Sequence, residues 1–532
     1  MYNNFNQYAY NEQIDEKELV NPKKIEYVEI DGSSLTVEKV VAVARFNAKV
    51  NISEDSIGRM KKSRDLVDKI VDEGRAAYGV STGFGEFSKV SIDKDLIEVL
   101  QQNLILSHCA GTGDFYKTEV VRAMMLLRAN ALCIGNSGIR PGVVKTLVKM
   151  INKGVTPCVP EKGSLGASGD LAPLAHMVLV LLGKGQAYYK GEILEGAEAM
   201  KRADIEVQVL KAKEGLALIN GTQAMNAVGT LSYYDALNAA RLADISCAMT
   251  MEALTALENA FDPRIQAVRP HPGQQYVANN IRNLIKGSEI IANSKDLRVQ
   301  DAYAIRCIPQ VHGAIRDALD HTRKVLEVEM NSVTDNPILF TEDEAVISGG
   351  NFHGEPLALA FDYLGIAVSE IANISERRLE RLVNPALSEG LPAFLTNHGG
   401  INSGYMICQY SAASMVSENK VLAHPASVDS IPSSANQEDH VSMGTTAARK
   451  SRKIVENTLS VLAFELMAAV QGVDLRGGKI SPLNKIVYDI VRSKVPFLDK
   501  DRELRIDISA MNELVRSGEI QEAVMESCAE FR

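Results

Sequence analysis

One short stretch of the chain combines residue types that could do chemistry with a backbone that could expose them. Residues 163–170 read GSLGASGD and contain the triplet Ala167, Ser168 and Gly169, and the apolar helical pattern LAPLAHMVLVLL follows at once. Asp170 is a candidate N-cap, and Pro173 is tolerated only in a first helical turn. The triplet should therefore lie just before a helix N-terminus.

Two familiar reactive motifs do not match this stretch. A phosphate-binding loop of the G-x-x-x-x-G-K-[ST] type needs a lysine that is missing here, although helix N-termini do bind anions. The G-x-S-x-G elbow of hydrolases has a spacing around its serine that Ser168 lacks. A glycine-rich capping loop is the plain alternative.

The triplet resembles the cyclising Ala-Ser-Gly of the aromatic amino acid ammonia-lyases and aminomutases, a family that includes lyases for histidine, phenylalanine and tyrosine. The resemblance extends over roughly residues 35–480, because several further blocks occur in the same order. These blocks are YGVSTGFG at 78–85, NGTQ at 220–223, QDAYAIR at 300–306, GNFH at 350–353 and SANQEDHVSM at 434–443.

The resemblance implies an internally made electrophile. In the family, the glycine amide nitrogen attacks the alanine carbonyl, and loss of water gives 4-methylidene-imidazole-5-one. Ala167, Ser168 and Gly169 are expected to form this group autocatalytically. The residue types make sense, since glycine offers an unhindered nitrogen, alanine is small, and the serine can lose its hydroxyl. No natural side chain is a strong electrophile, so a reaction that needs an electron sink must use a cofactor or make one.

The matching blocks also imply a base and a set of substrate ligands. Removal of the β-proton of an amino acid needs a nearby base, and Tyr78 matches the family's usual candidate. Arg306 matches the arginine that binds the substrate carboxylate, for which its planar fork is suited. The residues that match the positions holding the electrophile and the substrate amine are Tyr303, Phe352, Asn220 and Gln310.

Two places bear on the choice of substrate. The pair Ser107-His108 resembles the histidine lyases, although some tyrosine aminomutases share it. The block ANQEDHVSM has a carboxylate, Glu438, where members that act on carbocyclic amino acids typically have Asn-Gln-Asp followed by an apolar residue. A buried carboxylate can accept the N–H of an imidazole, whereas a phenyl ring offers no donor. We therefore expect His108 and Glu438 to bind the substrate, and L-histidine to be converted to trans-urocanate and ammonia.

Three other functions are alternatives to a histidine-specific lyase. Within the same family, a tyrosine or phenylalanine ammonia-lyase or a 2,3-aminomutase is the alternative. A zinc hydrolase could use His108, Glu438 and His440, but no H-E-x-x-H or comparable ligand spacing supports it, and no metal is expected. A non-catalytic helical assembly protein would not need an intact Ala-Ser-Gly triplet.

Long helices should position these residues. Apolar residues recur at three- and four-residue steps through 242–257, 364–382 and 455–470, and some of these patterns are apolar nearly all round. Such helices belong inside a bundle or between subunits. Residues 26–48 should form a short β-element that leads into a helix. We predict a mainly α fold, in which a long helix bundle adjoins a smaller N-terminal part of helices and loops that carries the electrophile.

The predicted organisation has four parts: a flexible polar tail over 1–24, the electrophile-bearing domain over 25–230, the long-helix bundle over 231–480, and C-terminal helices over 481–532. Members of the family are homotetramers whose active sites take residues from three chains. The resemblance therefore implies a homotetramer with sites shared between subunits.

Composition excludes several other classes of protein. The 532 residues carry a net charge of −10 and are 46% hydrophobic and 23% charged, which is ordinary for a globular protein and argues against nucleic-acid binding. The first 24 residues lack the features of a secretory signal, and the densest apolar stretch, 177–182, is far shorter than the ~20 residues that span a bilayer. The seven cysteines are scattered singly, so reduced thiols are expected. We expect a cytoplasmic enzyme without a membrane partner.

Overall fold

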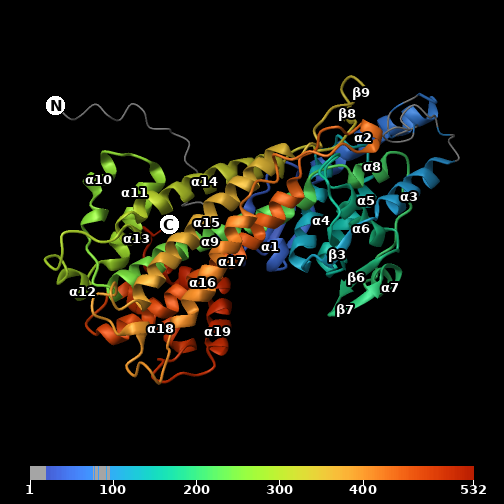
Figure 1. Ribbon diagram of the computed structural model, residues 1–532. Coiled ribbons are helices and arrows are strands. Elements are labelled where there is room, and N and C mark those ends of the chain that lie inside the picture. The colour runs from blue at the N-terminus through green and yellow to red at the C-terminus, as the bar shows by residue number, and fades with distance from the viewer. Residues whose placement is uncertain are drawn as a thin grey trace, which may run out of the picture.

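Long helices form the centre of the molecule and run along its length (Figure 1). The computed structural model describes residues 20–75, 77, 79, 82, 92 and 96–531. The central helices are α9 (Gln223–Ala253), α14 (Ile308–Glu329), α15 (Glu355–Val383) and α17 (Gly444–Arg476). Helices α15, α17 and α9 pack against one another, and α14 packs on α15 and α9. The predicted mainly α fold with a long helix bundle is confirmed.

The apolar patterns in the sequence explain why these helices are central. The patterns 364–382 and 455–470 fall in α15 and α17, and the pattern 242–257 begins in α9 and continues past its end at Ala253. Nearly every residue of α9 is buried. A helix that is apolar all round can be stable in water only when other elements cover it. Both α15 and α17 are long and apolar enough to cross a membrane, but 61% and 83% of their most apolar windows are buried inside the molecule. They are core helices.

The N-terminal part forms one end of the molecule. Its helices are α1 (Val37–Arg45), α2 (Glu54–Asp72), α3 (Ile97–His108), α4 (Thr118–Cys133), α5 (Pro141–Lys153), α6 (Leu171–Leu181), α7 (Gly196–Arg202) and α8 (Glu214–Ile219). Helix α4 packs on α9, and α3 and α8 both pack on α6. The expected β-element before the first helix is present as a strand that leads into α1.

Short strands between the helices of this part pair into small sheets. Strand β1 (Tyr27–Ile30) runs parallel to β2 (Lys49–Ile52), with Tyr27 opposite Lys49. The other pairs are antiparallel: β3 (Thr112–Phe115) with β5 (Pro160–Lys162), β6 (Gln186–Tyr189) with both β4 (Thr156–Pro157) and β7 (Glu192–Glu195), and β8 (Ile338–Phe340) with β9 (Ala345–Ile347).

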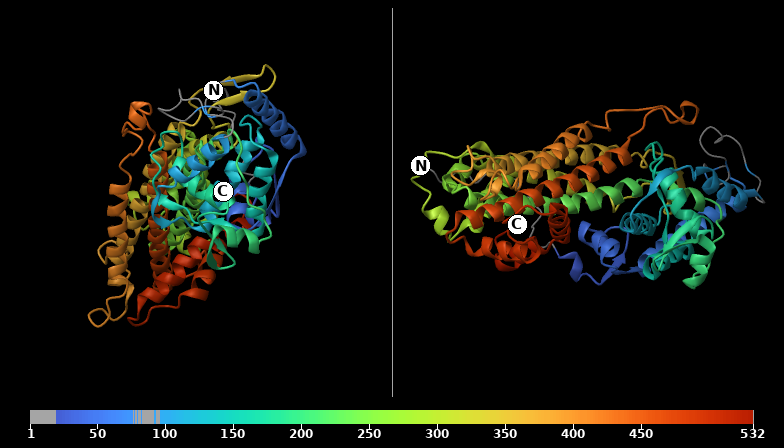
Figure 2. Two further views of the ribbon diagram at one scale, coloured as in Figure 1. Left: turned by 90° about the vertical axis from the view of Figure 1, so that its right-hand side faces the viewer. Right: turned by 60° about the horizontal axis from the view of Figure 1, so that its bottom comes forward.

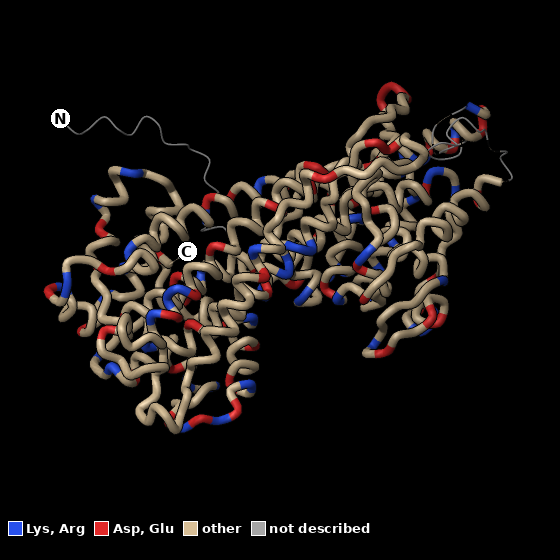
Figure 3. Tube along the Cα trace, viewed as in Figure 1, with Lys and Arg blue, Asp and Glu red and all other residues tan. Residues whose placement is uncertain are grey.

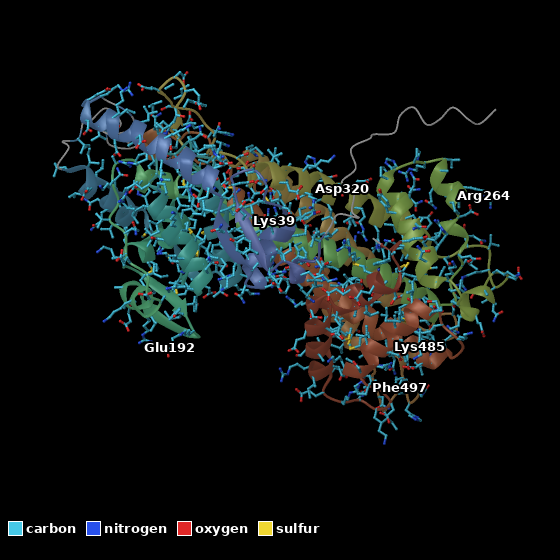
Figure 4. The ribbon with its side chains drawn as sticks, turned by 180° about the vertical axis from the view of Figure 1, so that it is seen from behind. Lys39, Glu192, Arg264, Asp320, Lys485 and Phe497 are labelled. Carbon is cyan, nitrogen blue, oxygen red and sulfur yellow. The ribbon has the colours of Figure 1, made fainter. Side chains whose placement is uncertain are left out.

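The other end of the molecule is made of shorter helices around the far end of the bundle (Figures 1 and 2). They are α10 (Pro263–Ala267), α11 (Pro272–Ile285), α12 (Glu289–Ala292), α13 (Tyr303–Arg306), α16 (Met406–Leu422), α18 (Pro482–Lys494), α19 (Leu504–Ser517) and α20 (Glu519–Ser527). Figure 4 marks the two ends with labelled side chains, Glu192 in β7 and Arg264 in α10.

The predicted division into four parts stays a prediction. Helix α9 begins at Gln223 and continues across the proposed boundary at residue 230, and one large apolar core extends through both sides. Residues 22–24 form the short 3-10 helix η3 (Pro22–Lys24). There the Lys23 ammonium lies 2.8 Å from a Glu522 carboxylate oxygen of α20.

Candidate active site

The triplet lies where the predicted loop meets α6. Ala167 and Gly169 are buried and Ser168 is half-buried. Gly169 has a φ of +72°, and a Cβ atom there would lie 2.2 Å from the carbonyl oxygen of Gly221. Only glycine fits such a position. The backbone of Gly169 forms a bridge with Gly221, so the NGTQ block is packed directly against the triplet.

Asp170 holds the triplet in a way that differs from the prediction. It does precede α6, which begins at Leu171, but its side chain makes no capping bond to that helix. Instead its carboxylate accepts a 2.8 Å hydrogen bond from the backbone N–H of Met225 in the first turn of α9. Asp170 is thus the N-cap residue of α6, as predicted, but its carboxylate bonds a free N–H group of a second helix and not of α6.

The Asp170 carboxylate is also bound from two other elements. The Ser164 hydroxyl donates to it at 2.7 Å, and the Thr445 hydroxyl at the start of α17 donates as well. Its backbone N–H donates to the Gly221 carbonyl at 2.7 Å. Burial raises the pKa of Asp170, while these donors act against the rise. One buried carboxyl group thus joins the triplet to α9 and α17.

Glu438 lies against the serine of the triplet. The Ser168 hydroxyl donates a 2.9 Å hydrogen bond to one oxygen of Glu438, and the Ser433 hydroxyl donates to the other at 3.1 Å. Glu438 belongs to residues 423–443, which connect α16 to α17 and which we call the 423–443 segment. Its Ser442 donates to the Gly166 carbonyl through both its backbone N–H, at 3.2 Å, and its hydroxyl, at 3.1 Å. The segment is therefore fixed to the loop of the triplet.

A strained turn leads up to Glu438. Three consecutive residues of the 3-10 helix η8 (Ser434–Asn436) have φ values of +50°, +53° and +66°. Residues other than glycine rarely adopt this left-handed region, and such strain concentrates at functional sites. A backbone bridge between Ser433 and Glu438 closes the turn. The turn sets the direction in which the Glu438 carboxylate points.

His108 is the third group near the triplet. It is the last residue of α3, and its Nδ1 atom lies 3.1 Å from the Ser107 hydroxyl. Burial lowers the pKa of His108, and the nearby Glu438 carboxylate acts in the opposite direction. His108 therefore lies near the Glu438 carboxylate that the Ser168 hydroxyl binds.

Asn220 and Phe352 border this group. Asn220 follows α8, is 4% exposed, and its backbone oxygen accepts a 2.8 Å hydrogen bond from Arg128. Its side-chain oxygen is buried and has no hydrogen-bond partner. Such an atom is costly unless another group satisfies it. Phe352 is half-buried in the turn before α15, and the next residue, His353, lies 3.4 Å from the backbone oxygen of His440 in the 423–443 segment.

The remaining predicted ligands lie far from the triplet. Tyr303 and Arg306 are in α13 and Gln310 is in the first turns of α14, whereas the triplet precedes α6. Helices α13 and α6 occupy opposite ends of the elongated molecule (Figures 1 and 2). A single chain therefore does not bring these three residues to Ser168.

The α13 group has an exposed and incompletely bonded surface. Tyr303 is 69% exposed, and the Arg306 guanidinium lies over its ring at 4.7 Å from the ring centre. Arg306 donates a 2.8 Å hydrogen bond to the Gln300 side chain, but its Nε atom is buried without a partner. This surface is suited to contact another molecule.

Tyr78, the predicted base, lies outside the described residues. No sequence pattern indicated two buried polar pairs of this region. Glu329, near the end of α14, accepts a 2.5 Å hydrogen bond from the Thr222 hydroxyl, and Lys213 pairs with Asp335 at 2.7 Å. Isolated acidic residues in helical patterns give no sign that they will meet a distant loop.

A cavity of about 410 Å³ lies elsewhere, between α1, α9, α17 and α19. Charged residues of its lining form ion pairs with one another: Arg45 and Arg452 each pair with both Glu119 and Asp235. It contains none of the predicted site residues. The three groups of the rival zinc hydrolase, His108, Glu438 and His440, do not form a cluster of metal ligands in the described part of the chain.

Comparisons with known proteins identify the family to which the chain belongs. A sequence profile of the family described as "Aromatic amino acid lyase" matches residues 35–493. A histidine ammonia-lyase of Caldanaerobacter subterraneus subsp. tengcongensis is 59% identical over 500 residues, which cover 94% of this chain and 98% of the relative. The crystal structure of histidine ammonia-lyase from Trypanosoma cruzi superposes with a TM-score of 0.89 at 43% identity, covering 95% of this chain and 97% of that one.

A tyrosine aminomutase shares the fold equally well. Its crystal structure, from Streptomyces globisporus, has a TM-score of 0.89 at 39% identity and covers 94% of this chain and 98% of its own. The backbone fold therefore does not separate ammonia-lyases from aminomutases, and the distinction must come from side chains.

Proposed function

Because the chain belongs to the aromatic amino acid lyase family, we propose that it eliminates ammonia from L-histidine to give trans-urocanate. Its class, carbon–nitrogen lyase, follows from the family. The observation that carries the choice of histidine is the hydrogen bond between Glu438 and Ser168, together with the position of His108 near the Glu438 carboxylate. These two groups can hydrogen-bond both nitrogens of an imidazole, and a phenyl ring would leave them unpaired.

We propose that Ala167, Ser168 and Gly169 cyclise to 4-methylidene-imidazole-5-one. The residues present fit this group. Gly169 is held in a left-handed conformation against Gly221, where any side chain would clash. The buried, unpartnered Asn220 oxygen is an acceptor suited to an N–H of the substrate amine. Once formed, the group supplies the electrophile that no natural side chain provides.

The other side chains bind and orient the substrate, move its proton or position the electrophile. Arg306 holds the substrate carboxylate with its planar fork, and Tyr78 takes the β-proton. The remaining residues hold the substrate amine and the electrophile in place, and these are Tyr303, Asn220, Gln310 and Phe352. Glu438 and His108 orient the imidazole so that the β-carbon faces the base.

We propose that the active enzyme is a homotetramer whose sites combine residues of several subunits. The exposed Tyr303 and the unpartnered Nε of Arg306 support this, since they lie at the end of the molecule opposite the triplet. An exposed apolar stripe on α15 supports it further. Leu359, Tyr363 and Ile366 are 55%, 46% and 44% exposed, at the spacing that places them on one helix face.

We propose a cytoplasmic location and neither a nucleic-acid nor a membrane partner. The net charge of −10 disfavours binding to phosphate backbones. Figure 3 shows Lys and Arg scattered among Asp and Glu along the chain rather than gathered in one stripe.

A tyrosine or phenylalanine ammonia-lyase or 2,3-aminomutase is the second candidate, and the equal fold similarity to a tyrosine aminomutase favours keeping it. Incubation of the full-length protein with histidine, tyrosine or phenylalanine separates the candidates. We expect the absorbance of urocanate to rise with histidine and little conjugated acid from the other two. A β-amino acid as the main product would show that the protein is an aminomutase and not a lyase. A preference for tyrosine would overturn the choice of histidine as substrate.

A further inference from the structure

Two histidines and a glutamate meet at the edge of the candidate site. His353, Glu355 and His440 present ligand atoms that all lie within 4.8 Å of one another. His353 and Glu355 belong to the turn that begins α15, and His440 belongs to the 423–443 segment, 87 positions from His353. The fold, not a local sequence motif, assembles this group.

One carboxylate oxygen in the group lacks a partner. The Oε2 atom of Glu355 has no exposed surface and no hydrogen bond. A carboxylate oxygen that is withdrawn from water without a donor costs free energy, and a cation is one species that removes this cost. A Glu355 carboxylate oxygen also lies within 4.8 Å of ligand atoms of two imidazoles, which are themselves metal ligands.

The contacts of His353 leave one ring nitrogen facing Glu355. Its Nε2 lies 3.4 Å from the backbone oxygen of His440, which can only accept, so this contact favours a proton on Nε2 and a lone pair on Nδ1. Nδ1 lies 3.3 Å from the backbone N–H of Glu355, a long and weak contact that a stronger ligand would replace. A metal-bound histidine commonly donates its other N–H to a backbone carbonyl, as Nε2 does here.

The His440 ring completes the set. It lies parallel to the His353 ring, with the ring centres 5.6 Å apart and an angle of 10° between the planes. His440 is exposed and Glu355 is half-buried, so both can turn about their side-chain bonds. Zinc binds such ligands at about 2.0–2.2 Å, which places ligand atoms about 3.4 Å apart. Closing from within 4.8 Å needs only side-chain rotation.

We propose that His353, Glu355 and His440 bind Zn²⁺. Two imidazole nitrogens and one carboxylate oxygen suit zinc, with water in the fourth position. The ion joins the turn that carries Phe352 to the segment that carries Glu438, and so fixes two parts of the candidate site relative to each other. Its role is to position these parts, and the site does not require the substrate to be histidine.

Metal analysis of the full-length protein tests this site. The protein is stripped with a chelator, loaded with ZnCl₂ and passed through a desalting column, and zinc per chain is then measured. We expect one Zn²⁺ per chain in the wild type and a higher melting temperature with zinc than without it. His440→Gln and Glu355→Gln should each bind zinc about tenfold or more weakly. His424→Gln, at an exposed histidine in the same segment, is the matched control and should bind as the wild type does.

Cobalt provides a second measurement that needs no variant. Zinc on one of the free cysteines would give Co²⁺ substitution a strong thiolate-to-cobalt absorption band, whereas the proposed ligands give only weak visible bands of a nitrogen and oxygen site. Zinc retention that is unchanged in both His440→Gln and Glu355→Gln would overturn the proposal. The thiolate band, or a wild type that retains no zinc, would overturn it as well. If one variant fails to fold, the other variant and the cobalt spectrum decide.

Discussion

The Ser168 hydroxyl donates a 2.9 Å hydrogen bond to the Glu438 carboxylate across 270 positions of sequence. This bond places one of the two groups proposed to distinguish an imidazole from a phenyl ring directly beside the residue proposed to become the electrophile. Conversion of the serine to a methylene removes the hydroxyl, so one oxygen of Glu438 loses its donor. That oxygen is then available to accept a hydrogen bond from the substrate.

Ser168→Ala should keep the fold and assembly and lose nearly all activity, because alanine has no hydroxyl to eliminate. Intact-protein mass spectrometry checks the cause directly. The wild type should be lighter than its sequence by two waters, and the variant should lack the alkene. Ser433→Ala is the matched control, since it also removes a hydroxyl bound to Glu438 but should still lose two waters. Full sequence mass together with full activity in the wild type would refute the internal electrophile.

Tyr78→Phe should form the electrophile normally and lose turnover, because Tyr78 is assigned to proton removal and not to cyclisation. A positioned general base contributes on the order of 10²–10⁴ in rate, and kcat should fall by that factor. The mass deficit of two waters serves as the internal control. Normal turnover would assign the base to a different group.

Co-expression tests whether subunits share a site. Ser168→Ala and Arg306→Ala homotetramers should both be inactive. Suppose that the two residues of one site come from different chains. In a random 1:1 mixture, about half of the sites have an intact Ser168, and about half of those also have an intact Arg306, so roughly a quarter of the sites are complete. We therefore expect roughly a quarter of the wild-type rate from tagged, purified mixed tetramers. A mixture that stays inactive would mean that both residues of a site belong to the same chain.

The pH dependence of stability should report the buried carboxyl of Glu329. Burial raises its pKa, and the Asp170 carboxylate adds to the rise. A raised pKa in the folded state means that the carboxyl stabilises the fold below its ordinary value of about 4.3 and that this stabilisation is lost as the pH rises through the folded value.

Glu329→Gln removes this titration while retaining an oxygen that can accept from Thr222. Between pH 4.5 and pH 8, the melting temperature of the wild type should fall by about 1 °C relative to that of the variant. Glu342→Gln, at an exposed position of the same charge, should follow the wild type. Parallel curves for Glu329→Gln and the wild type would show that Glu329 does not titrate differently in the folded protein.

Sequence patterns predicted the helices, but they did not predict which residues of different helices contact one another. The apolar steps through 242–257 and the pair Asp170 and Pro173 located a buried helix and the start of α6, because these are local or periodic signals. The carboxylate of Asp170 instead bonds the first turn of α9, which depends on how the two helices pack. No local pattern contains that information.

The separation of Arg306 from Ser168 illustrates a second limit. Both residues were named from blocks of sequence, and the order of the blocks does not say whether the fold brings them together in one chain. The structure places them at opposite ends of the molecule because α14 runs the length of the bundle between them. Likewise, Gly169 was recognised as part of the triplet, but its tight contact with Gly221 required the fold.

Measurement of kcat/KM for histidine, tyrosine and phenylalanine, in the wild type and in Glu438→Gln, tests the central claim most directly. A site built to hydrogen-bond a polar ring can discriminate by up to about 10⁴ against an analogue that leaves its buried groups unpaired. We expect wild-type kcat/KM for histidine to exceed that for phenylalanine by about 10³ or more, with tyrosine between them. Glu438→Gln should reduce the histidine value while keeping the two-water mass deficit. A wild type that prefers tyrosine, or a Glu438→Gln variant with unchanged histidine turnover, would contradict the assignment.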